Sequence, residues 1–169
     1  MAEPGYRKGV AMGGDLSARP AAAKAPVFMI AALRDPREAP LQRIQIIKGW
    51  LDGTPQEAVF DAACSNGQPP NAQTHRCDFA GVDFEPDVCA PREASGAAEL
   101  RVRWQDPDFD PAQRAFYYVR VLQIPTCRWS TYDAARSGMA VPAHLPRTIQ
   151  ERAITSPIWY TPQLTRSQP

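Results

Sequence analysis

The sequence predicts an all-β protein, an antiparallel immunoglobulin-like β-sandwich with long loops and short helical turns. Its 169 residues suffice for one compact domain with a hydrophobic core. Its 18 prolines work against long helices and favour short strands joined by turns. Its apolar residues fall into about six short runs separated by turn residues, the pattern of a sandwich. Closure of the strands into a barrel is the alternative architecture.

The first two strands are expected at Val27–Leu33 and Arg43–Leu51. Val27–Leu33 is apolar throughout and stops at Asp35-Pro36, a pattern typical of a strand buried on both faces. Arg43–Leu51 carries apolar residues on both faces. Either both of its faces are covered, or its register slips at a bulge near Ile47.

A hairpin is expected next. Asp52-Gly53 supplies a turn, and Glu57–Ala63 returns as the second arm. Thr54-Pro-Gln-Glu57 also fits a helical capping box. We reject this helix because too few apolar residues follow before Cys64.

Two further strands lie in the second half of the chain. Glu99–Trp104 alternates between apolar and charged residues, which predicts a half-buried strand. Ala115–Ile124 is apolar on both faces and is expected at the centre of a sheet. Between them, Gln105–Pro111 contains Asp-Pro twice and predicts a rigid turn.

The C-terminal part predicts short elements. Ser130–Arg136 is expected to form a helical turn that ends near Gly138, and Thr148–Glu151 resembles a capping box that opens another turn. Pro157–Tyr160 predicts a short last strand. The expected organisation is an extended lead-in at 1–26, the sandwich at 27–162 and a disordered tail at 163–169.

The cysteines predict disulfides. They form an even set in which three members lie in or beside one turn-rich stretch: Cys64, Cys77, Cys89 and Cys127. We favour Cys77 with Cys89, which closes a short loop, and Cys64 with Cys127, which ties that loop to the core. Other pairings, free buried thiols and a metal site are the alternatives, although His75 and Cys77 do not have the spacing of a zinc site.

Composition excludes several classes of function. The net charge is +1 and the arginines are scattered, so we expect no nucleic-acid partner. The longest apolar run, Val27–Leu33, has 7 residues, so we expect no membrane span. Disulfides favour an oxidising compartment, whereas Met1 to Gly14 lack the apolar stretch of a secretory signal.

The sequence offers no catalytic residue and no set of metal ligands. His75 and His144 are not spaced as ligands, and neither a glycine-framed serine nor a phosphate-binding glycine loop is present. Asp106–Asp110 opens like a calcium loop, but Pro111 stands where that loop needs glycine, so a turn is favoured. The four tryptophans are expected in the core, with an aromatic sugar-binding surface as the alternative: Trp50, Trp104, Trp129 and Trp159.

Several longer motifs run along nearly the whole chain. They are Gly5-Tyr-Arg-Lys-Gly9, Met12-Gly-Gly-Asp15, Arg43-Ile-Gln-Ile-Ile-Lys-Gly-Trp50, Trp104-Gln-Asp-Pro-Asp-Phe-Asp-Pro111, Ala115-Phe-Tyr-Tyr-Val-Arg-Val121, Ile124-Pro-Thr-Cys-Arg-Trp129, Thr148-Ile-Gln-Glu-Arg-Ala153 and Ser156-Pro-Ile-Trp-Tyr160. Together they resemble the C-terminal end of a bacterial family of proteins of unknown function, family 3604. Full members of that family resemble metal-dependent hydrolases of the polymerase-and-histidinol-phosphatase type, akin to carbaryl hydrolase, and many are exported.

The resemblance implies a divalent metal bound by histidine-rich motifs of an N-terminal catalytic region, motifs that this sequence does not contain. We therefore expect a non-catalytic β-sandwich region, a fragment whose partner is that N-terminal domain, with no cofactor of its own. It would be periplasmic or secreted if the parent protein carries a signal peptide. Arg7, Lys8 and Asp15 are the predicted cleft-rim or interface residues, because the lead-in has no core of its own. The alternative function is a free-standing carbohydrate-binding module.

Overall fold

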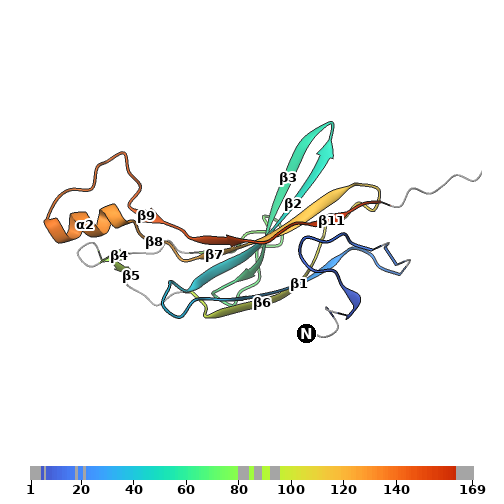
Figure 1. Cartoon of the computed structure of the whole chain (residues 1–169), viewed down its shortest axis with the longest axis horizontal. Coiled ribbons are helices and arrows are strands. Elements are labelled where there is room, and N and C mark those ends of the chain that lie inside the picture. The colour runs from blue at the N-terminus through green and yellow to red at the C-terminus, as the bar shows by residue number, and fades with distance from the viewer. Residues whose placement is uncertain are drawn as a thin grey trace, which may run out of the picture.

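The protein is an all-β antiparallel sandwich, whose described residues also include a short helix at Trp129–Ser137 and helical residues at Gly5, Arg7 and Lys8 (Figure 1). The computed structural model describes residues 5, 7–17, 19–20, 22–79, 84–85, 89–91 and 96–162. The predicted fold class is thus confirmed. The expected tail at 163–169 lies outside the described residues.

The larger sheet is built on two long central strands. Its order is β10-β7-β2-β3, and β11 also pairs with β7 beyond the end of β10. All of these pairings are antiparallel, and their strands are β2 (Leu41–Asp52), β3 (Thr54–Cys64), β7 (Ala115–Gln123), β10 (Arg152–Ile154) and β11 (Ile158–Tyr160). The predicted hairpin at Asp52-Gly53 joins β2 and β3, and the central position expected for β7 is confirmed.

A two-stranded ribbon forms the second layer. It pairs β1 (Val27–Leu33) with β6 (Glu99–Gln105) and packs on one face of the larger sheet. The side chains of the core come from alternate positions along each strand, because successive side chains of a strand point to opposite faces of its sheet. Its buried members are Phe28, Leu41, Ile44, Ile46, Ala62, Leu100, Ala115, Tyr117 and Tyr160.

Small elements extend the molecule at the end away from the β2–β3 hairpin (Figure 1). They are β4 (Phe84–Glu85), β5 (Ala90–Pro91), β8 (Thr126–Cys127), α2 (Trp129–Ser137) and β9 (Thr148–Ile149). The expected helical turn is confirmed as α2, which ends at Gly138 in the left-handed conformation that favours glycine. No helix in the described ranges is long and apolar enough to span a membrane.

Two local predictions are corrected, and an alternative left open for β2 is decided. Thr148–Ile149 forms a strand paired with β8 rather than the start of a helical turn, because the backbone groups that a helix would need pair with Thr126–Cys127. Both faces of β2 are covered, which is the first of the two alternatives. Its register shifts lie between Ile44 and Gln45 against β3 and between Leu41 and Arg43 against β7, and not near Ile47. Strand β1 is buried on one face only, because Val27, Met29 and Leu33 on its other face are exposed.

The lead-in is attached to the sandwich rather than free of it. Leu16 donates its N–H to the Trp159 carbonyl at 2.8 Å, and Trp159 donates to the Gly14 carbonyl at 3.0 Å. Asp15 thereby forms a parallel bridge with Trp159 of β11, and Leu16 packs on the core. The domain boundary at residue 26 stays a prediction.

Candidate functional site

A group of polar side chains lies on the face of the larger sheet opposite the ribbon. At its centre is Asp61 of β3, which is 5% exposed. Gln45 of β2 donates to Asp61 Oδ1 at 2.6 Å, and the backbone N–H of Cys77 donates to Asp61 Oδ2 at 2.7 Å. The register explains this meeting, since Gln45 pairs directly with Asp61 on one side and with Arg120 of β7 on the other.

Two arginines lie beside this carboxylate, and a third is connected to it through Gln45. Arg43 Nε and Arg76 Nη1 lie 3.7 Å and 3.8 Å from Asp61 Oδ1. Arg120 joins through Gln45, because its Nε donates to Gln45 Oε1 at 2.8 Å. Burial lowers the pKa of Arg43, and the charges of Arg76 and Arg120 lower it further against the opposing effect of Asp61. We call Gln45, Asp61 and these arginines the Asp61 cluster.

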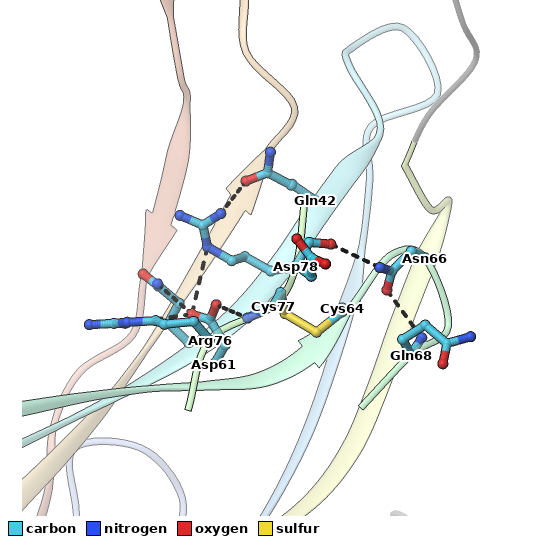
Figure 2. Close-up of a disulfide and its surroundings, with 10 residues drawn as sticks. Gln42, Asp61, Cys64, Asn66, Gln68, Arg76, Cys77 and Asp78 are labelled. Carbon is cyan, nitrogen blue, oxygen red and sulfur yellow. Dashed lines mark hydrogen bonds and ion pairs between the residues drawn. A yellow bond between two sulfur atoms is a disulfide. The ribbon is translucent and has the colours of Figure 1, made fainter. Parts of the chain in front are cut away.

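A disulfide loop holds one side of the Asp61 cluster in place (Figure 2). Cys64 ends β3 and pairs with Cys77, so residues 65–76 fold back over the strand they have just left. Asn71 accepts hydrogen bonds from the N–H groups of Gln73 and Thr74 and closes the turn at the tip. The loop then returns Arg76 and Cys77 to Asp61.

The predicted cysteine pairing is wrong, although all four cysteines are disulfide-bonded. The bonds are Cys64–Cys77 and Cys89–Cys127 rather than Cys77–Cys89 and Cys64–Cys127. The physical reason is the path of the first loop, because Asp61 binds the Cys77 N–H and so brings Cys77 back to the end of β3. Cys89 is then left to pair with Cys127 of β8.

A second group of polar side chains is buried around Asp106, at the start of the Asp-Pro turn. Lys48 of β2 lies 2.8 Å from Asp106 Oδ2 and donates to the Asp108 carbonyl at 2.7 Å. The Tyr117 hydroxyl donates to Asp106 Oδ2 at 2.7 Å. Burial raises the pKa of Tyr117, and the hydrogen bond to Asp106 raises it further. Each polar atom has a partner, so this group fixes the Asp-Pro turn to β2 and β7. The turn predicted at these residues is confirmed, because Asp106 Oδ1 accepts the Asp108 N–H.

The outer face of the ribbon carries an exposed apolar file. Residues Val27, Met29 and Leu33 of β1 point away from the core and are 39%, 44% and 76% exposed. Their neighbours across the ribbon on β6 are polar or charged, since Arg103 pairs with Met29 and Glu99 with Leu33. A groove of about 410 Å³ lies beside Leu33 and continues between β1 and β10.

The predicted interface residues lie in two places. Arg7 and Lys8 are exposed and follow Gly5, which lies against Met29, since a methyl group built on Gly5 would be 3.9 Å from Met29 Sδ. Asp15 is exposed beside Trp159, at the edge formed by β11. The roles given to these three residues stay predictions.

The tryptophans do not share one surface. Trp104 packs on the rings of Phe28 and Phe60 in the core, and Trp50 packs against the same core. Trp129 is 72% exposed at the start of α2. Trp159 lies on the outer face of the larger sheet in contact with Phe116, which stacks on Tyr118.

Sequence reasoning missed the Asp61 cluster and the Lys48 group. Their members come from different strands and loops, so no linear motif joins them. One signal was available, because Lys48 and Asp61 each interrupt an apolar run on a strand that is buried on both faces. A charge at such a position indicates a buried partner.

Comparison with known proteins identifies one family. The sequence profile described as "Protein of unknown function (DUF3604)" matches residues 1–162. No curated protein and no solved structure matches the chain. Within the described ranges, no group of three or more His, Cys, Asp or Glu side chains is arranged to hold a metal ion.

Proposed function

Because the chain belongs to the family of proteins of unknown function DUF3604, we propose that it is a non-catalytic β-sandwich that packs against a metal-dependent hydrolase-like domain. The kind of partner follows from the resemblance of the family to such hydrolases. The contact surface is the outer face of β1. In this arrangement the partner domain holds the divalent metal.

The apolar file on β1 supports this proposal. A strand that faces solvent alternates apolar and polar residues, as β6 does with Leu100, Arg101, Val102 and Arg103. Strand β1 instead presents apolar side chains on both faces, and those of its outer face remain exposed. Large exposed apolar patches with a polar rim mark interaction sites. We infer that another domain covers this file.

The surroundings of the file fit a domain interface. The groove beside Leu33 offers room for a partner side chain, and Arg34, Glu151 and Arg152 on its lining provide charged contacts. Toward the other end of β1, Gly5 lies next to Met29, shortly before Arg7 and Lys8 in the chain. We place Arg7, Lys8 and Asp15 at the rim of the partner's cleft.

The test is a binding measurement between this chain and the histidine-rich region of a longer family member. Calorimetry is expected to show saturable one-to-one binding. Leu33→Asp is expected to weaken it at least about tenfold, since burying a leucine side chain contributes about 1.5–3 kcal/mol. Met139→Asp is the matched control, because Met139 is similarly exposed, at 68%, in the segment after α2.

Two results would overturn the proposal. One is equal loss of binding in Leu33→Asp and Met139→Asp, which would show that β1 is not the contact surface. The other is activity of the isolated chain: one equivalent of a divalent metal bound, together with hydrolysis of phosphate or carboxyl esters.

A second candidate function is carbohydrate binding by an aromatic strip on the outer face of the larger sheet. Trp159 is 39% exposed there and its ring lies 5.2 Å from that of Phe116. Sugar rings stack on such surfaces through their apolar faces. Titration of tryptophan fluorescence with oligosaccharides discriminates the two functions, because only a sugar-binding module changes its signal, and Trp159→Ala removes that change.

A further inference from the structure

We propose that the Asp61 cluster binds a phosphate group, either inorganic phosphate or the phosphate monoester of a larger molecule. This site is separate from the outer face of β1 and does not depend on the function proposed above. Asp61 lies on β3, on the opposite side of the larger sheet from the ribbon.

The net positive charge of the Asp61 cluster favours the binding of an anion. The cluster contains three positive charges, those of Arg43, Arg76 and Arg120. Asp61 is the acidic residue whose negative charge acts on Arg43. Among the described residues that act on Arg43, this leaves an excess of two positive charges. A phosphate monoester carries a charge of about −1.5 to −2 at neutral pH, so a single phosphate group balances the cluster.

Hydrogen-bond donors of the cluster are left over. Arg43 Nε has no hydrogen-bond acceptor in the described ranges, because Asp61 Oδ1 is 3.7 Å away, and it has almost no contact with solvent. The Arg43 side chain as a whole is 23% exposed, so a phosphate oxygen would meet the accessible part of its guanidinium rather than Nε. Arg76 touches Asp61 only at 3.8 Å and its side chain is 49% exposed, so its guanidinium is accessible. Planar guanidinium groups with unused N–H donors are the usual partners of phosphate oxygens.

The arginines are held in place before any ligand binds. Arg43 Nη1 donates to Gln42 Oε1 at 2.5 Å, and Arg120 Nε is fixed on Gln45. The Cys64–Cys77 disulfide returns the third arginine, Arg76, to Asp61, as Figure 2 shows. Fixed donors reduce the entropy that binding costs. A half-buried setting also strengthens the attraction between Arg43 and an anion relative to bulk water.

The experiment is an NMR titration of the ¹⁵N-labelled, disulfide-intact chain with inorganic phosphate at constant ionic strength. The Nε–H signal of Arg43 is expected to shift and saturate. Arg76→Gln is expected to weaken binding about tenfold, since it removes one hydrogen-bonded charge, and Arg76→Lys to weaken it less. Arg37→Gln, at an exposed arginine outside the cluster, is the control and is expected to leave affinity unchanged.

Titrations with methyl phosphate and with acetate distinguish a phosphate monoester from the free ion and test whether the site selects phosphate. Methyl phosphate that binds as well as inorganic phosphate assigns the site to a monoester, and its rejection assigns the site to the free ion. The proposal is overturned if the Arg43 signal never saturates, if acetate binds as tightly as phosphate, or if Arg37→Gln weakens binding as much as Arg76→Gln.

Discussion

Tyr117 contributes to stability through its hydroxyl as well as its ring. The hydroxyl donates to the buried carboxylate of Asp106, which also pairs with Lys48. Tyr117→Phe keeps the ring in the core and removes that donor. We expect the free energy of unfolding at pH 7 to fall by about 1.5–3 kcal/mol, the usual contribution of a hydrogen bond to a charged group. Tyr132→Phe, on α2, is expected to change it by less than about 0.5 kcal/mol.

The same residue gives a pH dependence with a definite sign. Burial raises the pKa of Tyr117 in the folded state above its value of about 10 in the unfolded chain. The contribution of this group is therefore complete below about pH 10 and declines as the pH rises further. Denaturant unfolding between pH 7 and 11 is expected to show a steeper loss of stability for the natural chain than for Tyr117→Phe. Equal slopes would contradict this account.

Single residues were the hardest feature to predict from the sequence. Lys48 and Asp61 acquire their roles from partners on other strands or loops, so their spacing along the chain carries no information. The turn predicted at Asp106–Asp110 is confirmed, because turn chemistry is local: Asp106 and Asp110 each accept an N–H two residues ahead.

At the scale of elements, the close contact between β2 and β7 depends on a glycine. Gly49 lies directly opposite Phe116, and a methyl group at Gly49 would be 2.3 Å from the end of the Phe116 ring. Its φ is not in the left-handed region, so the ring alone excludes a side chain. The Phe116 ring lies over the backbone of β2 at this position.

We therefore expect Gly49→Ala to lower the free energy of unfolding by about 1–3 kcal/mol, the usual cost of overpacking. In a Phe116→Ala background the same change is expected to cost much less, because the obstructing ring is gone. Denaturant unfolding of the two single variants and the double variant gives a coupling energy of at least about 1 kcal/mol. A coupling energy near zero would show that Phe116 does not set the cost.

Elements with local signals were predicted well. Alternation located a strand at Glu99–Trp104, one residue shorter than β6, and Gly138 marked the end of α2. The cysteine pairing failed because it depends on how the 65–76 loop folds back on β3, which no local pattern encodes. The helical turn expected at Thr148 failed because pairing with β8 overrides a capping preference of about 1 kcal/mol.

At the scale of the whole molecule, the two layers assemble from segments far apart in the chain. Strand β1 pairs with β6, and β2 lies between β3 and β7. The apolar residues of these strands form the core that β1, β2, β3, β6, β7 and β11 share. By contrast, α2 lies at one end of the molecule and buries only Thr131 and Ala134. This difference in burial predicts that the two parts do not have equal stability.

Hydrogen exchange in native conditions tests this difference. Amides of β2 and β7 are expected to exchange only through global unfolding, whereas those of α2 are expected to exchange at least about a hundredfold faster through local opening. Thr131 anchors the helix by donating its hydroxyl to the Arg147 carbonyl at 2.7 Å. Thr131→Val is therefore expected to speed exchange in α2 by roughly three- to tenfold, the effect of one lost hydrogen bond, and to leave β2 unchanged. If α2 and β2 exchange at the same rate, the helix belongs to the same cooperative unit as the sandwich, and its apparent isolation at the end of the fold has no energetic meaning.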